Sequence, residues 1–316
     1  MIASARPARF RAAGVALITV LLVVFLASLT ATSLVTAQQL AVRRSTLLLQ
    51  QQQARLYTLG AEQWAASILT RDRQANATDD LGEEWTALPP ALPVEGGAVS
   101  GRIEDLSARF NLNNLLKDGT LDPLQLRALQ RLLGFLDLNP GIAQAIADWI
   151  DPDQDIAYPD GAEDSEYLSR DPPYLTANRP LQSITELRLI KGIDDAVYTK
   201  LAPYVAALPS GSAVNLNTAP APVLAAFLEP LSLEQAQTLV TQRGTEGFDG
   251  EDGFRAAAGL RAFNFQPLRL GFTSRHFLVF AKAQVGDARA QLYSVLARAD
   301  SGAVVALARS YGADGG

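Results

Sequence analysis

The 316-residue sequence has no cysteine, a single histidine (His276) and a single methionine. Without cysteine no disulfide can form, so an exported chain of this kind must be held together by packing or by a bound metal. One histidine leaves no scope for histidine metal sites or histidine-based triads, and we expect His276 at the surface because it precedes a predicted strand. Glycine-rich phosphate loops and nucleophile elbows are also absent from the sequence. These absences favour a non-enzymatic protein.

Positive charge is in deficit as well. The 27 Lys and Arg residues are outnumbered by 33 Asp and Glu residues, which gives a net charge of −6. Because a nucleic-acid partner needs a basic face for its phosphates, this balance argues against one. The hydrophobic content of 48% is ordinary once an apolar N-terminal stretch is set aside. The remaining length is sufficient for two compact parts.

Charged residues are missing altogether between Arg11 and Arg43. The stretch from Val15 to Leu29 is almost entirely apolar, and it follows a short basic leader that ends at Gly14. About 20 apolar residues at 1.5 Å rise per residue cross the ~30 Å hydrocarbon layer of a bilayer. Residues 15–37 are therefore predicted to span a membrane once.

The arginines of the leader predict the orientation of this span. Arg6, Arg9 and Arg11 precede it, so the N-terminus is expected in the cytoplasm and the bulk of the chain on the other side. The alternative is a cleaved secretory signal peptide. However, the apolar stretch is longer than the 7–15 residues typical of such peptides, and Ala31–Ser33 and Thr36–Ala37 match their cleavage site only loosely.

Helix-forming residues continue beyond the span. Residues 38–73 are rich in Gln, Leu, Ala and Arg, with no proline and one glycine, Gly60. A single helix from Val15 to near Thr70 would be on the order of 80 Å long, half in lipid and half packed on a soluble domain. Apolar residues recur in its second half at three- and four-residue steps, which predicts one apolar stripe: Leu40, Leu47, Leu48, Ala54, Leu56, Leu59, Trp64 and Ile68.

A basic leader, a glycine and an apolar helix that runs into an amphipathic one resemble the precursors of type IV pilins and type II secretion pseudopilins. The resemblance implies that a prepilin peptidase cleaves after Gly14 and methylates the new N-terminus at Val15. Most members have Glu at the fifth mature position, thought to neutralise a neighbour's terminal amine, whereas this chain has Thr19. Because an unpaired charge in lipid is costly, a subunit with Thr19 has no partner for the amine of a subunit above it. The resemblance thus implies a place at the fibre tip.

Among the Glu-lacking members, the chain resembles the protein K family of minor pseudopilins of type II secretion. The resemblance rests on residues 11–24, 53–64 and 101–115 and extends over nearly the whole chain. It implies a single-pass subunit of the bacterial inner membrane, with most of the chain in the periplasm, that takes part in protein export and in initiating pseudopilus assembly. It also implies packing against the minor pseudopilins I and J, and contact with the exported protein or the outer-membrane secretin.

Strands are predicted at two distant places in the chain. Residues 98–105 alternate in polarity, and three further strands are expected at 275–285, 288–299 and 303–311. Ribbons of two or three strands are marginal alone, so we expect the strand at 98–105 to join the C-terminal strands in one antiparallel sheet on the long helix. Before this strand, residues 88–93 form a proline-rich connector.

The predicted fold class is therefore α+β: a pilin-like long N-terminal helix on a small antiparallel sheet, with a large inserted all-α domain of helix-hairpin-helix or SAM-like type. Capping residues indicate helices in the insertion: Asp122 before Pro123, Asn139, Ser183 and Ser232. The predicted division is 1–14 leader, 15–37 membrane span, 38–112 amphipathic helix and first strand, 113–265 inserted domain, and 266–316 C-terminal strands.

Two further patterns lie in the insertion. Asn111-Leu-Asn113 recurs as Asn215-Leu-Asn217, which indicates a duplicated helical unit. Residues 187–196 resemble a helix-hairpin-helix, which leaves open the alternative of a membrane-tethered DNA-binding protein of a DNA-uptake system. Acidic residues follow Ile193 where DNA-binding hairpins usually have glycine, and they would repel a phosphate. Two helices joined by a glycine turn, without DNA binding, is the favoured interpretation.

The segment from Asp148 to Asp171 contains nine carboxylates and one basic residue, Arg170. Carboxylates at alternating positions let a turning loop aim several oxygens at one point, as Ca²⁺ requires. The pattern is not an EF-hand, because Ile156 occupies the position that needs glycine. We expect a calcium loop holding one or two ions, as the resemblance to protein K also implies. The candidate ligands are Asp151, Asp153, Asp155, Asp160, Glu163, Asp164 and Glu166.

Alternatives to this calcium loop remain. One is a solvated acidic loop, although carboxylates packed so densely repel one another unless something neutralises them. Mg²⁺ suits the loop less well, because it prefers octahedral, partly hydrated sites. A calcium-dependent adhesin or enzyme is a further functional class that such a loop would fit.

Overall fold

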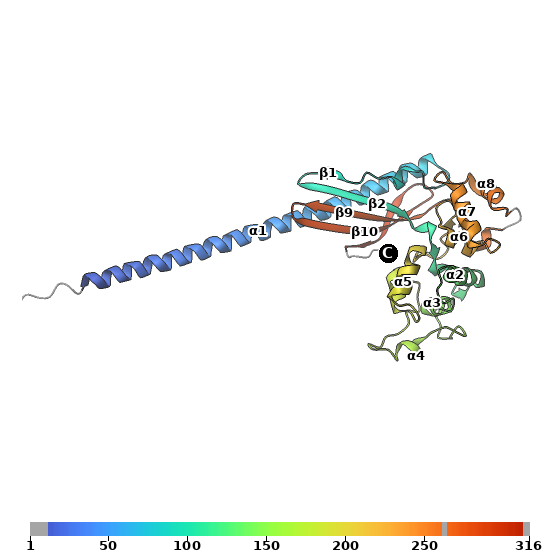
Figure 1. Cartoon of the computed structure of the whole chain (residues 1–316), viewed down its shortest axis with the longest axis horizontal. Coiled ribbons are helices and arrows are strands. Elements are labelled where there is room, and N and C mark those ends of the chain that lie inside the picture. Colours follow the sequence, from blue (N-terminus) through green and yellow to red (C-terminus); the bar gives the residue numbers. More distant parts are fainter. Residues whose placement is uncertain (1–11, 261–263, 312–316) are drawn as a thin grey trace, which may run out of the picture.

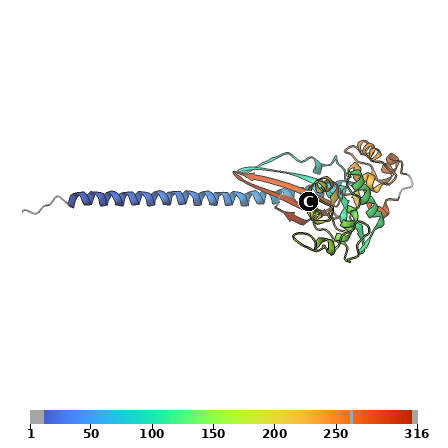
Figure 2. The ribbon, with the colours of Figure 1, turned by 60° about the horizontal axis from the view of Figure 1, so that its bottom comes forward.

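The computed structural model describes residues 12–260 and 264–311, so the first eleven residues of the predicted leader lie outside the described part of the chain. A single helix, α1 (Ala12–Ala75), projects from a globular head as a rod (Figures 1 and 2). Its 64 residues correspond to about 96 Å at 1.5 Å per residue. The prediction of one helix from Val15 to near Thr70 is confirmed.

The first half of α1 contacts no other part of the described chain. All residues from Val15 to Leu49 are exposed, although most of them are apolar. Within the described residues this is the one helix long and apolar enough to cross a membrane. It fits a single-pass membrane anchor.

A five-stranded antiparallel sheet lies along the second half of α1 (Figure 1). Its spatial order is β1-β2-β9-β10-β11. The strands are β1 (Leu92–Val94), β2 (Gly97–Asp105), β9 (His276–Val285), β10 (Ala288–Arg298) and β11 (Val304–Ser310). The pairing of β2 with β9 places Asp105 opposite Phe277, as the expected union of one early strand with the C-terminal strands requires. The edge strand β1 was not predicted; it includes Pro93, which an edge position tolerates because no ladder N–H is needed there.

The contact between α1 and the sheet corrects the prediction of one apolar stripe. Ala54 and Ile68 are fully buried against the sheet, but Leu48 and Leu56, predicted on the same stripe, are 62% and 67% exposed. Polar side chains take part in the buried face instead, because the sheet supplies partners for them. Glu62 is buried, accepts hydrogen bonds from Ser294 and forms an ion pair with Arg309 at 2.8 Å.

All the longer helices other than α1 lie between β2 and β9 in sequence and form the far end of the head (Figure 1). The α-helices are α2 (Pro123–Phe135), α3 (Ile142–Ile150), α4 (Asp164–Tyr167), α5 (Asp195–Leu201), α6 (Ala221–Phe227), α7 (Leu233–Arg243) and α8 (Gly250–Ala258). The predicted caps of α2 and α7 are present: Asp122 accepts from the N–H of Leu124, and Ser232 forms a capping box with Gln235. The largest apolar cluster of the described residues lies within this helical part.

Short 3₁₀ helices and strand pairs complete the head. The 3₁₀ helices are η1 (Glu84–Thr86), η2 (Leu106–Ala108), η3 (Leu112–Leu115), η4 (Ile184–Leu189), η5 (Ala202–Tyr204) and η6 (Gln266–Leu268). The two-residue strands pair as β3 (Phe110–Asn111) with β6 (Val205–Ala206), β4 (Leu116–Lys117) with β5 (Thr120–Leu121), and β7 (Val214–Asn215) with β8 (Leu270–Gly271). The insertion is therefore mainly helical, with these minimal strand pairs where its segments cross.

The repeated Asn-Leu-Asn motif has the same structural role at both places. Each motif begins in a parallel strand pair, β3–β6 or β7–β8. The Asn113 side chain binds both the N–H and the C=O of Leu181, at 2.8 and 2.9 Å. The Asn217 side chain binds both backbone groups of Phe248 in the same way, at 2.8 and 3.1 Å. The echo in the sequence thus corresponds to two matching buried asparagine braces.

The pilin-like part is joined to the helical part by buried hydrogen bonds: Asn215 donates to the carbonyl of Asp79 at 3.0 Å, and Thr218 donates to Asp105 at 2.5 Å. Buried ion pairs hold the pilin-like part itself together at this junction. Arg298 is 3% exposed and forms ion pairs with Asp72 at 2.7 Å and with Asp79. Asp79 also accepts a hydrogen bond from the N–H of Ser274. The expectation for His276 was wrong: it is 8% exposed, because it is the first residue of the central strand β9 rather than of a surface turn.

Candidate metal centre

Asp148 organises the acidic segment from the last turn of α3. Its carboxylate is fully buried and accepts hydrogen bonds from the N–H of Ala162 at 2.8 Å and from the N–H of Ala157 at 3.1 Å. The chain from Asp151 to Gly161 therefore wraps around the end of α3. Lys191 donates from Nζ to the carbonyl of Gly161 at 3.3 Å and attaches the loop to the segment before α5.

Asp148, Asp151 and Glu163 form a carboxylate cluster. One oxygen from each of these three residues lies within 4.8 Å of the other two. Glu163 is 2% exposed, and neither of its oxygens has a hydrogen-bond partner among the described residues; the same holds for Oδ1 of Asp151. Buried carboxylate oxygens without donors are costly unless a proton or a cation compensates them.

The surroundings shift the pKa of all three carboxylates upward. Burial, reinforced by the charges of Asp148 and Asp151, raises the pKa of Glu163 to about 8. Burial and the neighbouring charge of Asp153 raise the pKa of Asp151 to about 7, and burial raises that of Asp148. Each shift reflects the cost of placing negative charge in a site that lacks a positive one. A bound divalent cation would remove this cost, so the residues present fit an oxygen-coordinated metal ion.

The structure places the seven predicted ligands in different surroundings. Asp151 and Glu163 lie in the cluster, and Asp153 and Asp155 are near enough for their charges to raise the pKa of Asp151.

The other three predicted ligands have contacts outside the cluster. Asp160 is exposed beside Gly141. Asp164 accepts hydrogen bonds from the N–H and hydroxyl of Thr176, and Glu166 pairs with Arg170 at 3.4 Å.

Asp148 was the boundary of the predicted loop but was not among the candidate ligands. It belongs to the apolar helix α3, where its neighbours Trp149 and Ile150 are buried. A charged residue in a buried helical turn is expensive without a partner, and this was the signal in the sequence that could have identified it.

A second group of acidic residues, Asp72, Asp79 and Glu83, also lies close together. Its charge is partly compensated, because Arg298 pairs with both aspartates, although burial and these aspartates still raise the pKa of Glu83 to about 8. Glu83 accepts hydrogen bonds from the Trp85 indole at 2.6 Å and from Asn76 at 3.1 Å. Of the two groups found among the described residues, the cluster at Asp148 is the one that combines buried carboxylates with oxygens that lack donors.

The segment that resembles a helix-hairpin-helix packs against the acidic loop. Gly192 makes the turn with a positive φ of 81°, between η4 and α5. Lys191 donates its backbone N–H to the hydroxyl of Tyr167 and one hydrogen bond from its ammonium group to the carbonyl of Gly161, so both groups have partners within the chain. This geometry offers no support for the alternative of DNA binding through the hairpin.

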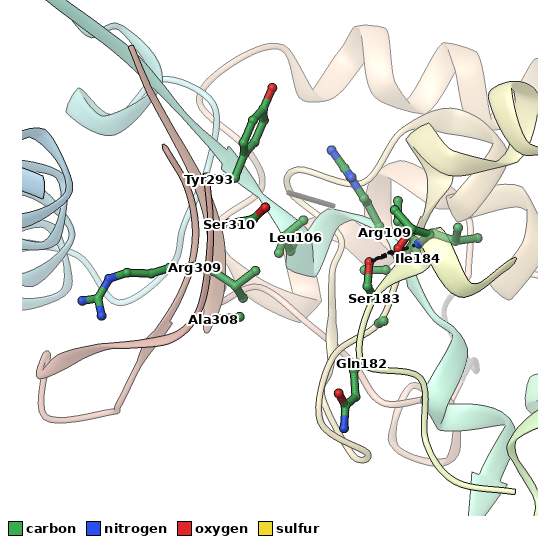
Figure 3. A pocket seen from close by; sticks show the side chains of 14 residues that line it. Leu106, Arg109, Gln182, Ser183, Ile184, Tyr293, Ala308, Arg309 and Ser310 are labelled. Carbon is green, nitrogen blue, oxygen red and sulfur yellow. Dashed lines mark hydrogen bonds between the residues drawn. The ribbon is translucent and has the colours of Figure 1, made fainter. Parts of the chain in front are cut away.

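A cleft of about 300 Å³ separates the outer face of the sheet from the helical part. Figure 3 shows Ala308 and Ser310 of β11 on one side of the cleft and Ile184 of η4 on the opposite side. The Arg309 side chain points away from the cleft, toward α1. The charged residues that line it are Arg109 and Arg309, which pair with Glu104 and Glu62. The lining therefore contains no pair of groups suited to acid–base catalysis.

Comparison with known proteins identifies the family. Models of "Type II secretion system (T2SS), protein K" match residues 108–210 and 214–272. A type II secretion system protein K of Pseudomonas aeruginosa is 39% identical over 313 residues, covering 96% of this chain and 93% of the relative. The chain belongs to the type II secretion system protein K family. It is thus a minor pseudopilin of a type II secretion system, and the predicted resemblance is confirmed.

Another protein K relative and a solved structure also match most of the chain. That of Aeromonas hydrophila is 33% identical, over 97% of this chain and 99% of the relative. A solved structure, the GspK-GspI-GspJ complex from enterotoxigenic Escherichia coli, contains a chain with a TM-score of 0.76 and 29% identity. That match covers 86% of this chain and 100% of the solved chain. It also bears out the predicted α+β pilin-like fold.

Proposed function

We propose that this chain is the tip subunit of its pseudopilus, where it takes part in protein export and in initiating fibre assembly. The observation that carries the proposal is Thr19. Its hydroxyl donates to the carbonyls of Ala16 at 2.9 Å and Val15 at 3.2 Å, within its own helix. No acidic side chain lies between Arg11 and Arg43 that could meet the terminal amine of another subunit in lipid. A subunit of this kind terminates a stack.

The proposed life cycle begins in the inner membrane. The precursor is inserted through α1 with its N-terminus in the cytoplasm, and the prepilin peptidase cleaves it after Gly14 and methylates Val15. The head then lies in the periplasm, above the apolar half of α1. Exposure of the uncharged stretch from Val15 to Val42 supports this arrangement, because a surface so rich in apolar side chains is stable only in lipid or against other apolar helices.

The proposed partners are the minor pseudopilins I and J. Support comes from the solved relative, whose chain of the same fold was found in a complex with GspI and GspJ. At the tip, the helical part of the head would be the first surface to meet the exported protein or the secretin. The role is structural rather than enzymatic, in keeping with the lining of the cleft in Figure 3.

Calcium is the proposed metal of the carboxylate cluster. Asp148, Asp151 and Glu163 would bind it, and Asp153 and Asp155, whose charges act on Asp151, are the proposed further ligands of this ion or of a second one. Hard oxygen donors from carboxylates suit Ca²⁺. When bound, the ion would supply the positive charge that Glu163 lacks and would fix the loop around α3. Its function is stabilisation of the head, since a ligand of the folded form alone stabilises by linkage.

N-terminal sequencing of the mature protein, purified with its partners from membranes, tests the proposal. We expect a methylated chain that begins at Val15 and co-purifies with I and J. A Gly14→Val variant is the matched control, and it should retain residues 1–14 because a branched side chain replaces glycine at the cleavage site. A mature chain that begins beyond residue 30, with no apolar segment, would overturn the proposal.

A further inference from the structure

An apolar slot of about 190 Å³ opens between α1 and the strands β1 and β2. Its lining includes Tyr57, Gly60 and Trp64 of α1, together with Leu88 and with Phe280 of β9. Gly60 is exposed, and a Cβ on it would meet no heavy atom within 4 Å. The slot is therefore open space beside the helix, left by a missing side chain.

The backbone of α1 does not require a glycine at this position. Gly60 lies in the interior of the 64-residue helix and does not adopt a positive φ. Glycine weakens a helix relative to alanine, and no close approach within this chain compensates for that loss. In membrane-anchored helices, small residues are characteristic of places where another helix comes close.

The flank of α1 that carries the slot continues into the membrane as an exposed apolar line. Val35, Val42 and Leu49 are 52%, 60% and 66% exposed. At 3.6 residues per turn, Val42 lies directly in line with Gly60, five turns below it, and Val35 and Leu49 lie within about 20° of the same line. This flank joins the membrane-spanning half of α1 to the slot beside β1 and β2. It is interrupted once, by Gln53, whose amide donates to Tyr57 and to the carbonyl of Glu95.

We infer that the slot receives one large apolar side chain from the long helix of a neighbouring minor pseudopilin, I or J, that runs up from the same membrane beside α1. This inference rests on the proposed function. The occupant must be apolar along its length, because it contacts Val35 and Val42 within or next to the bilayer. A helix is the single segment that can leave lipid with all its backbone groups satisfied. The slot then fixes the vertical register of the two helices.

Two substitutions at one position separate helix stability from docking. Gly60→Ala adds a methyl group to open space, so it should raise the melting temperature and leave co-purification with I and J unchanged. Gly60→Leu should melt at or above the temperature of the wild-type chain, because its side chain fills the slot itself. Co-purification of Gly60→Leu with I and J from membranes should nevertheless fall roughly tenfold or more, as expected when one large buried side chain is displaced.

Cysteine labelling gives a second, independent readout, since the chain has no cysteine of its own. A Gly60→Cys variant should react with a maleimide in the isolated chain and be protected in the complex with I and J. Lys117→Cys, at an exposed position of β4 in the helical part, is the control and should react equally in both.

Each outcome decides the matter. If the wild-type chain fails to co-purify with I and J, the proposed function and this inference both fail. If the wild-type chain binds them, but Gly60→Leu binds equally well and Gly60→Cys stays reactive in the complex, the slot is not the docking site. In that case this inference fails and the proposed function stands. Disulfide-linked pairs of the Gly60→Cys chain would show that a second copy of this protein occupies the flank, and would also overturn the inference.

Discussion

Gly161 lies directly against Asp148: a Cβ on Gly161 would be 2.2 Å from Oδ2 of the Asp148 carboxylate and 2.6 Å from the carbonyl of Ala157. The same Oδ2 accepts the N–H of Ala162 at 2.8 Å. The acidic loop is therefore closed around one buried carboxylate, at a place where only glycine fits. The cluster that Asp148 forms with Asp151 and Glu163 depends on this contact.

Gly161→Ala should open the loop. The added methyl group cannot be accommodated without moving Asp148 or the backbone at Ala157, so we expect a loss of about 1–3 kcal/mol, typical of overpacking. Gly134→Ala in α2 is the control, because its Cβ would meet nothing within 4 Å and the change should be neutral or stabilise by about 0.5–1 kcal/mol. Thermal unfolding of both variants, with and without calcium, checks the prediction. Equal effects of the two substitutions would contradict it.

Metal removal should make stability depend on pH. Without metal, Glu163 has a pKa of about 8 against an ordinary 4.5, and Asp151 about 7 against 3.8. The folded chain then holds more protons than the unfolded chain, so stability is lost as the pH rises from about 4.5 to about 8. Calcium binds the deprotonated carboxylates, so its stabilising effect should grow over the same window. Melting temperatures measured in EDTA and in calcium at several pH values test this.

Glu163→Gln is the control for this pH dependence. The amide cannot titrate, so the variant should lose most of the calcium response and part of the pH dependence in EDTA. The part that persists is expected from Asp151, Glu83 and Asp105, whose pKa values burial raises to about 7, about 8 and about 6. A melting temperature that calcium and EDTA leave unchanged at every pH would exclude the metal site.

The asparagine braces should be worth more than ordinary polar contacts. Asn113→Ala removes bonds to Leu181 N–H, Leu181 C=O and Leu208 C=O, and all of these groups are buried. Because unsatisfied buried groups cost about 1–3 kcal/mol each, we expect a loss of at least about 3 kcal/mol. Asn139→Ala, which removes one hydrogen bond from the N–H of Gly141 in the turn before α3, should cost about 1 kcal/mol. Denaturant unfolding of both variants measures the difference, and similar losses would refute the role of the brace.

The buried ion pairs of Arg298 should also matter more than surface pairs. Arg298→Met leaves Asp72 and Asp79 buried without a counter-charge, and removal of one partner of a buried pair costs about 3–5 kcal/mol. Arg275→Met breaks an exposed pair with Asp300 and should cost less than about 1 kcal/mol. Chemical unfolding in urea compares the two. An Arg298→Met chain as stable as the Arg275→Met chain would show that the aspartates are solvated or protonated there.

The fold could be predicted in outline because its signals are local. An uncharged run between Arg11 and Arg43, caps such as Asp122, and alternating strands each identify one element without knowledge of the others. The union of β2 with β9 also followed, because neither strand group was large enough to be stable alone. The small edge strand β1, with three residues and a proline, has no such signal.

The contacts of side chains could be predicted only in part. The acidic loop was recognisable from its charge density, but not that Asp148 is its centre or that Asp164 and Glu166 have partners elsewhere. On α1, hydrophobicity alone assigned Leu56 to the packed face and missed Glu62, because the partners Ser294 and Arg309 lie more than 230 residues away. Tertiary contacts of this kind are invisible to periodicity.

The long helix α1 has a mechanical consequence. It has no proline, and its last turns pack against the sheet, to which the ion pair between Asp72 and Arg298 of β10 joins them. Sharp kinks in helices arise almost always at proline, at glycine pairs or at bulges, and α1 lacks the first two. A push or rotation applied to the N-terminal end of α1 is therefore transmitted along the helix to the whole head, because neither proline nor a glycine pair provides a kink that would absorb it.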